Sequence, residues 1–166
     1  MEIEIREATL KDLKFMRQIY EEGVGGGHFV PQPGISVDRM LQEWVTRKMM
    51  VRQAVRLDGF YTEAIPLNLL IAELDGVSAG FLISSPETPE ALSSIEMYVL
   101  GVAKFARRRG VATSLIEYEE QRYSSETSFY TRCFIKSSWA ISLFQKLGYR
   151  IERISPNTKM HYLRKP

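Results

Sequence analysis

The chain has 166 residues, 45% of them hydrophobic and 25% charged, with a formal net charge of +2, which is typical of a single folded domain over residues 1–166 and excludes a disordered chain. The small net charge gives no general reason to bind nucleic acid or a membrane, and no apolar run is long enough to span a bilayer. One cysteine excludes an intrachain disulfide, and with only two histidines we expect no metal site and a cytoplasmic location.

The N-terminal third predicts one strand and two helices. Isoleucine alternates with charged residues at the start, which is typical of a strand with one buried face. Thr9 caps the helix that follows, with an acidic residue in the capping-box position, and we expect this helix to end at Gly23. After a glycine- and proline-rich loop, Ser36 caps a second helix, whose apolar stripe we expect to extend as far as Leu57.

The rest of the chain alternates strands with helices. Residues 67–74 and 77–83 flank an Asp-Gly pair, a type I′ turn signal that predicts a β-hairpin. An apolar strand follows at 95–102. The remaining expected elements are a helix from 111 to about 123, a strand at 128–135, a helix from Ser137 to Gly148, and strands at 149–154 and 159–163.

The most informative stretch joins the strand ending at Val102 to the helix beginning at Val111. Three consecutive arginines, Arg107–Arg109, precede Gly110 there. The first amides of a helix lack intrahelical acceptors and carry the positive end of the helix dipole, so this junction suits phosphate. Gly110 permits close backbone approach, and the small Ala112 leaves room for a ligand. We interpret the junction as an anion-binding site, with a solvated basic turn as the alternative; it is neither a Walker loop nor a Rossmann fingerprint.

The order Val-x-x-x-x-Arg-x-x-Gly-x-Ala after an apolar strand resembles motif A of the GNAT acyltransferases. The segment from Ser137 to Tyr149 is similar to the late helix of that family, usually Asn-x-x-Ala-x-x-Leu-Tyr-x-x-x-Gly-Phe. The resemblance implies an α/β (α+β) fold. The expected fold has a mixed, mostly antiparallel central sheet of six to seven strands flanked by helices, in the order β-α-α-β-β-β-α-β-α-β-β.

The resemblance also implies a function. It indicates an N-acetyltransferase that moves an acetyl group from acetyl-CoA to a primary amine of a small molecule or protein, by direct attack in a ternary complex. A non-catalytic acyl-CoA sensor is the alternative, because Phe144 stands where the family usually has a tyrosine acting as general acid. A nucleic-acid-binding module using residues 104–109 is the weakest candidate, since aromatic residues do not interleave with the basic ones. We expect neither a nucleic-acid nor a membrane partner, and a homodimer is left open.

In the family, acetyl-CoA binds where the central strand meets the following helix. Gly101 indicates a β-bulge there, which would expose backbone amides. Ser137 stands where an asparagine often contacts the pantetheine arm, although it could act only as a helix N-cap. The cofactor-binding residues that the resemblance implies are Leu100, Gly101, Val102, Arg107, Arg108, Arg109, Gly110, Val111, Ala112, Thr113, Ser137 and Phe144.

Glu96 is the candidate general base, since an acyl acceptor amine must lose a proton before it attacks. Alternation places Glu96, Tyr98 and Leu100 on one face of the strand. The alternative is a structural carboxylate held by an arginine. With Phe144 unable to give a proton, the candidate acid is Tyr130, and solvent protonation of the thiolate is the default. The other candidate acids are Tyr149, Ser138, Ser142 and Cys133.

The acceptor side of the site is the least defined by the sequence. In the family the first two helices and their loop shape the acceptor pocket, which here means residues 23–34 and the helix after them. His28 and Phe29 are candidates to line it, although a solvated loop histidine is the more ordinary interpretation.

Overall fold

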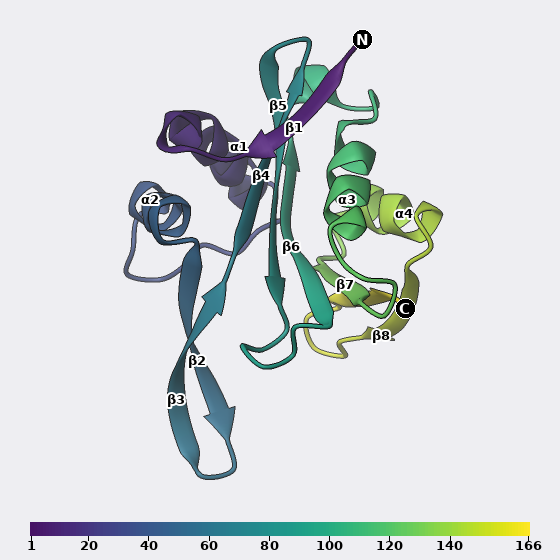
Figure 1. Cartoon of the computed structure of the whole chain (residues 1–166). Helices are drawn as coiled ribbons and strands as arrows, with labels where there is room; N and C mark the ends of the chain where they lie inside the picture. The colour runs from purple at the N-terminus through teal and green to yellow at the C-terminus, as the bar shows by residue number, and fades with distance from the viewer.

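A seven-stranded mixed sheet runs through the computed structural model, which describes residues 1–166 (Figure 1). Only the β6–β7 pair is parallel, and every other neighbouring pair is antiparallel. The strands, in spatial order, are β1 (Ile3–Glu7), β4 (Asn68–Leu74), β5 (Val77–Pro86), β6 (Ser94–Val102), β7 (Ser128–Cys133), β9 (His161–Lys165) and β8 (Arg150–Ile154). The predicted mixed, mostly antiparallel sheet is therefore confirmed.

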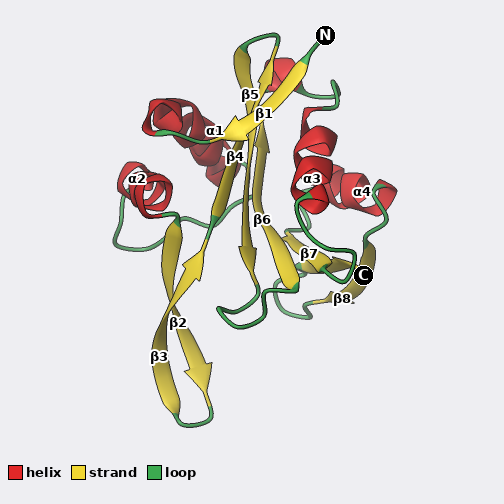
Figure 2. Ribbon diagram, in the orientation of Figure 1, coloured by secondary structure: helices red, strands yellow, loops and turns green.

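Helices cover both faces of this sheet (Figure 2). The first pair, α1 (Leu13–Gly25) and α2 (Val37–Arg47), lies on one side, and α3 (Val111–Gln121) with α4 (Ser138–Lys146) lies on the other. Short 3-10 turns, η1 (Leu10–Asp12) and η2 (Lys104–Ala106), precede α1 and α3. Each face has its own apolar core, because alternate strand residues point to opposite helix layers. No helix has both the length and the apolar character needed to cross a bilayer.

The second helix ends ten residues earlier than predicted. Lys48 terminates α2 in a left-handed conformation, and the next residues form a separate hairpin, β2 (Met49–Arg56) and β3 (Gly59–Pro66). The prediction that α2 reaches Leu57 was wrong because a short apolar run carries no helical period of its own. Leu57 and Asp58 form the hairpin turn, since Arg56 pairs with Gly59. The hairpin projects from the body of the molecule (Figure 1).

Strand β6 does not alternate regularly. Its pairing with β5 shifts register between Ile83 and Ser84, opposite Tyr98, so Tyr98 is an extra residue in β6. Val99 therefore packs in the α1/α2 core, while Leu100 packs in the α3/α4 core. The prediction that Leu100 shares a face with Glu96 was wrong for this reason.

The bulge is not at Gly101, which pairs in regular register with Phe81. A Cβ atom at Gly101 would lie 2.5 Å from Ile19 Cγ2 and 2.9 Å from Phe81 Cε1. The glycine is required because α1 packs closely against β6 at this position, rather than because the strand bends there. The bulge predicted at Gly101 was therefore wrong, and the bulge that β6 does have lies at Tyr98, closer to Glu96.

Candidate active site

The turn between β6 and α3 has the geometry of an anion-binding site. The Ser114 amide donates to the Gly110 carbonyl at 2.9 Å as the first hydrogen bond of α3, so the amides of Val111, Ala112 and Thr113 precede the helical ladder. Gly110 has a φ of 85°, and no atom lies closer than 3.8 Å to a Cβ placed there. Glycine is needed for its backbone conformation rather than for lack of space.

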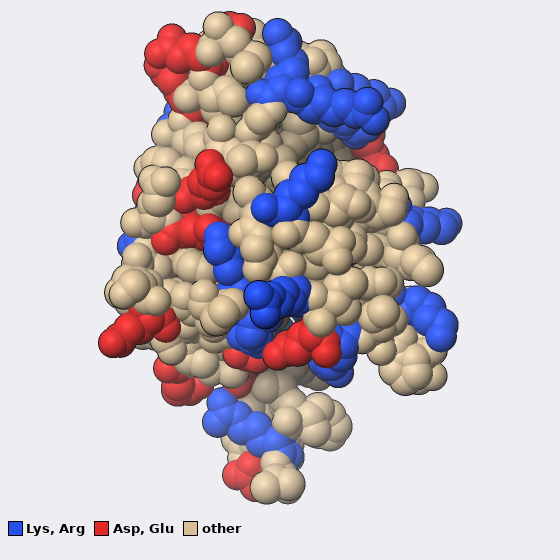
Figure 3. Space-filling view, turned by 90° about the vertical axis from the view of Figure 1, so that its right-hand side faces the viewer, with Lys and Arg blue, Asp and Glu red and all other residues tan.

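The arginines of this turn are free to bind an anion. Arg107, Arg108 and Arg109 are exposed, and none of them forms an ion pair with a carboxylate. Arg107 Nε donates to the Val102 carbonyl at 3.3 Å. Basic side chains gather at the upper end of the molecule in Figure 3, where the η2–α3 turn lies. Val111 points its side chain into the core, so only its amide can serve a ligand.

Strands β6 and β7 separate soon after they meet. Their parallel pairing covers only Ser94–Glu96 and Ser128–Tyr130. Beyond Glu96, β6 continues to Val102 with no strand paired on that side. The edge of β6 that pairs with no strand therefore faces this gap, and it leads from Glu96 to the turn that carries Arg107–Arg109, called the arginine turn below. Side chains reach two of its carbonyls: Thr131 Oγ1 donates to that of Met97 at 3.0 Å, and Arg107 to that of Val102.

Glu96 lies at the point where the two strands separate. Its side chain is almost fully buried, and Arg132 Nε lies 2.6 Å from its Oε1 atom. The Tyr130 hydroxyl donates to Oε2 at 3.1 Å. Burial, followed by the negative charge of Glu96, raises the pKa of Tyr130 well above its ordinary value. The tyrosine therefore stays neutral and acts as a hydrogen-bond donor to the carboxylate.

A pocket of about 430 Å³ opens beside Glu96. It lies where β6, β7, β9 and β8 meet the hairpin, and Arg52 of β2 closes it by donating to the Glu87 carbonyl at 2.5 Å. Its lining is charged and aromatic and consists of Arg52, Glu87, Glu96, Tyr130, Arg132, Glu152, Arg153, Tyr162 and Arg164. A polar pocket that contains a buried carboxylate is the strongest candidate for the reaction centre.

The acetyltransferase (GNAT) domain family matches residues 66–151, from before β4 to the start of β8. The chain belongs to the GNAT family. Acetyl transfer is the general chemistry of this family, so membership supports acyl transfer in general terms. A search of curated proteins gives no sequence match.

Solved structures share the whole fold of this GNAT domain. A GCN5-related N-acetyltransferase from Kribbella flavida is 19% identical, with a TM-score of 0.75 over 99% of this chain and 97% of that one. A ribosomal-protein-alanine N-acetyltransferase from Brucella melitensis is 20% identical, with a TM-score of 0.72 over 98% of both chains. The Salmonella typhimurium protein yncA, solved with its cofactor acetyl-CoA, is 16% identical, with a TM-score of 0.70 over 99% of this chain and 94% of that one.

In this GNAT domain, two residues of the late helix have contacts that the sequence did not predict. Ser137 stands at the N-cap of α4, but its side chain forms no capping hydrogen bond. Its hydroxyl instead lies 2.7 Å from His28 Nδ1, which joins the α1–α2 loop to the β7–α4 turn. Phe144 is buried in the α3/α4 core, where its ring packs edge-on against Tyr149 at 4.9 Å.

The candidate acids differ in their access to Glu96. Tyr130 contacts it directly, whereas the Tyr149 hydroxyl donates to Glu120 at 2.8 Å from within the opposite core. Cys133 is buried in that core too, and burial raises the pKa of its thiol to about 11. The remaining candidates, Ser138 and Ser142, are exposed on α4. Tyr130 is the only member of this set that shares a hydrogen bond with Glu96.

The α1–α2 loop does not line the pocket beside Glu96. His28 contacts Ser137, and Phe29 stacks on Tyr20 with ring centroids 5.2 Å apart. The pocket is lined instead by the hairpin and the C-terminal strands. The expectation that His28 and Phe29 line an acceptor site does not hold for this pocket, because the sequence prediction lacked the hairpin altogether.

Ser85 is a buried neighbour of Glu96 that the sequence analysis missed, although it does not line the pocket. It pairs directly with Glu96 across β5 and β6, so both side chains lie on the same face of the sheet. Its Oγ atom is the only buried side-chain oxygen or nitrogen without a hydrogen-bond partner in the protein. Such unpaired buried groups are uncommon and often mark functional positions. A serine pair in an otherwise apolar strand was the available signal.

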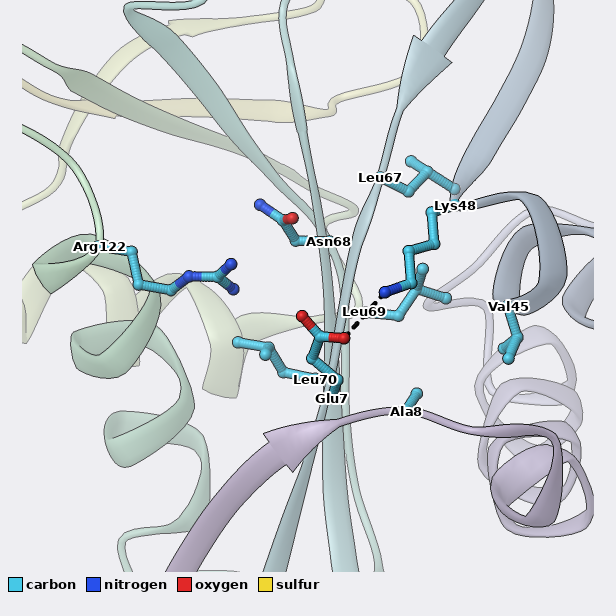
Figure 4. A pocket seen from close by; sticks show the side chains of 9 residues that line it. All are labelled: Glu7, Ala8, Val45, Lys48, Leu67, Asn68, Leu69, Leu70 and Arg122. Atoms are coloured by element: carbon cyan, nitrogen blue, oxygen red, sulfur yellow. Dashed lines mark hydrogen bonds and ion pairs between the residues drawn. The ribbon is translucent and has the colours of Figure 1, made fainter.

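A second, smaller pocket lies between β1, β4 and the ends of α2 and α3 (Figure 4). Its volume is about 50 Å³. Lys48 closes one side of it by binding Glu7 at 2.8 Å, and Arg122 points in from the end of α3. This volume is too small for a cofactor or an acceptor, so it is not a second active site.

Proposed function

We propose that the chain transfers an acetyl group from acetyl-CoA to a primary amine of a small molecule or protein. One observation carries the proposal: a single strand, β6, has a buried carboxylate at one end and an anion-binding turn at the other. Glu96 and Val102 are six residues apart, or roughly 20 Å in an extended strand. A cosubstrate with a diphosphate at one end and a thioester at the end of a long arm matches this arrangement.

The residues of the arginine turn fit the phosphate end of acetyl-CoA. The amides of Val111, Ala112 and Thr113 can donate to phosphate oxygens, and Arg107 and Arg109 add charge without any competing carboxylate. The unpaired edge of β6 can hold the pantetheine arm through backbone hydrogen bonds. Acetyl-CoA supplies an acetyl group activated as a thioester.

Glu96 accepts the proton that the acceptor amine must lose. A free primary amine has a pKa of about 10 and is mostly protonated at neutral pH, so a base near the acceptor is needed. Arg132 and Tyr130 each bind one oxygen of the carboxylate and fix its orientation. We assign Tyr130 to this positioning role. Its raised pKa disfavours proton release to a thiolate, and because thiols ordinarily titrate at about 8.5 the thiolate can leave without a general acid.

The test is a thiol-release assay with acetyl-CoA against a panel of amines, polyamines, amino acids, aminoglycosides and peptides, combined with calorimetry of CoA binding. We expect CoA to bind and at least one class of amine to accelerate thiol release. Absence of heat with CoA would overturn the proposal, because the proposal requires the arginine turn to bind the diphosphate of CoA.

A non-catalytic acyl-CoA sensor is the second candidate. It is favoured by Phe144, which cannot donate a proton, and by the close Glu96–Arg132 pair, which already occupies one carboxylate oxygen. A sensor would bind CoA with the same residues and release no thiol with any amine. The two assays therefore separate an enzyme from a sensor.

A further inference from the structure

The pocket beside Glu96 is rich in arginine. Four guanidiniums line it, from Arg52, Arg132, Arg153 and Arg164, together with three glutamates. Its volume of about 430 Å³ falls within the usual range of about 300–1,000 Å³ for small-molecule sites. An amine acceptor bearing several positive charges would meet like charge here. The charges of the pocket lining therefore help to determine which amines the pocket binds.

The strand register arranges these side chains in two rows across the sheet. In one row Glu96 pairs with Tyr130, and Tyr130 pairs with Arg164. Arg164 lies over the Tyr130 ring at 5.0 Å. The carboxylate and this guanidinium are thus two strands apart, or roughly 10 Å between backbones. One end of the row can take a proton and the other can bind an anion.

The second row places Tyr162 between two arginines, Arg132 on β7 and Arg153 on β8. The Arg153 guanidinium lies over the Tyr162 ring at 3.8 Å. Stacking holds the plane of a guanidinium while leaving its in-plane N–H groups free for oxygen acceptors. In this arrangement Arg153 can donate two parallel hydrogen bonds to a carboxylate.

The ion pairs leave part of this positive charge unmatched. Arg132 is taken by Glu96 at 2.6 Å, and Arg52 binds Glu63 at 3.4 Å. Arg153 forms no ion pair within 4.0 Å.

Arg164 is only partly matched. Its Nε is 3.4 Å from Glu152, and its Nη1 donates to the Ser94 and Ser128 hydroxyls at 3.2 Å. Glu87, the remaining carboxylate, is exposed. Arg153 and the Nη2 group of Arg164 are therefore available to a ligand.

Building on the proposed acetyl transfer, we propose that the acceptor is a small amine that carries a carboxylate. Its amine lies at Glu96, and its carboxylate is bound by Arg153 and Arg164. The separation of the two ends requires a carbon chain between amine and carboxylate. Polyamines and aminoglycosides are disfavoured as substrates, because their further cations would face four guanidiniums, while Glu96 and Glu152 are already paired with Arg132 and Arg164.

The first experiment compares matched acceptors. Thiol release is measured with the ω-amino acids from glycine to 6-aminohexanoate and with common L-α-amino acids, each against its own carboxamide. We expect kcat/KM to favour the carboxylate by at least about tenfold, as expected for a charge-assisted hydrogen bond that the amide cannot replace. The preference should be largest for the chain length that spans the row from Glu96 to Arg164.

The second experiment tests the assigned arginine. Arg153→Gln removes the stacked guanidinium while retaining a polar side chain, and we expect the carboxylate-to-carboxamide ratio to fall several-fold, since only Arg164 then remains to bind the carboxylate. Arg47→Gln is the matched control, because Arg47 is exposed at the end of α2 and outside the pocket. It should keep the wild-type ratio. CoA affinity, measured on both variants, reports whether the fold is intact.

The outcomes separate this inference from the proposed function. Equal or faster acetylation of carboxamides, polyamines or peptides would overturn the carboxylate assignment and leave acetyl transfer standing. CoA binding with no reaction of any small acceptor would also overturn it. Failure to bind CoA would instead overturn the proposed function. A wild-type ratio in the Arg153→Gln variant would remove Arg153 from the site.

Discussion

The two ends of β6 are built from different chemical groups and have different proposed roles. At its C-terminal end, Val102 leads into a turn whose useful groups are backbone amides and exposed arginines contributed by neighbouring residues of one segment. At its N-terminal end, Glu96 is almost fully buried and is held by side chains from β7. The pocket around Glu96 draws on five strands. A local segment can bind phosphate, whereas placing a buried carboxylate beside a substrate requires a folded sheet.

The comparison predicts that damage at the two ends will be separable. Changes at the arginine turn should alter affinity for CoA and leave the chemical step intact. Changes at the Glu96 end should alter the chemical step and leave CoA affinity intact. Results that fail to separate in this way would contradict the division of labour along the strand.

Glu96→Gln should have the largest effect. The amide keeps the shape of the side chain but cannot take a proton, so we expect kcat to fall by about 10²-fold or more. Glu117→Gln is the control, because Glu117 is exposed on α3, lies outside the pocket and forms no ion pair. If Glu96→Gln leaves the rate unchanged across pH, the base assignment fails.

Gly110→Val should have the largest effect at the other end. A β-branched residue at a φ of 85° is strained and would distort the turn that presents the Val111 amide. We expect the Kd for CoA, measured by calorimetry, to rise by about tenfold or more, the loss of one charge-assisted hydrogen bond. Gly59→Val is the control, because Gly59 also has positive φ (139°) and open space around it, but lies at the hairpin turn. Normal CoA affinity in Gly110→Val would contradict an anion site at this turn.

Arg107→Ala and Arg109→Ala should have smaller effects than Gly110→Val. Each removes one exposed charge while the amides remain, so we expect the Kd for CoA to rise by about threefold to tenfold, and less at high salt. The free energy of unfolding should change by less than about 0.5 kcal/mol, since neither arginine is in an ion pair. Arg47→Ala, far from the turn, is the control. A salt-independent loss, or a large loss of stability, would indicate a structural role instead.

The arginine turn was predictable because its residues are adjacent in the chain. The strand, the glycine and the helix follow one another between Val102 and Val111, so their order predicted the strand–turn–helix geometry that the structure has; phosphate binding at this turn stays a prediction. The hairpin at 49–66 was not predictable in the same way. Its apolar residues lie on two strands with mostly exposed faces, and the run to Leu57 can be interpreted equally well as the end of an amphipathic helix.

The Glu96 end needed the register of the sheet, which no single segment encodes. The bulge at Tyr98 depends on how β6 pairs with β5, and it moved Leu100 to the opposite face. The partners of Glu96 depend on the pairing of β6 with β7, and the nearby arginines depend on β8 and β9. Glu96 could be singled out as a carboxylate in an apolar strand, and Ser85 only as one of a serine pair in β5, whereas nothing local brings Arg132, Arg153 and Arg164 to the same pocket.

Ser85→Ala and Ser84→Ala, adjacent on β5, sharpen the comparison with the smallest changes. Ser84 donates to the buried Glu119 in the α3/α4 core, whereas Ser85 faces Glu96 with no partner. Losing the Ser84 hydroxyl should lower the free energy of unfolding by about 1–3 kcal/mol, because the buried Glu119 carboxylate loses one hydrogen-bond donor, and kcat should not change.

Losing the Ser85 hydroxyl breaks no hydrogen bond, so the free energy of unfolding should stay the same or rise. If Ser85 serves the acceptor amine or Glu96 during the reaction, kcat should still fall several-fold. Urea unfolding measures the free energy of unfolding of both variants, and steady-state kinetics measures their kcat. An unchanged kcat in Ser85→Ala would show that the Ser85 hydroxyl has no role in the reaction.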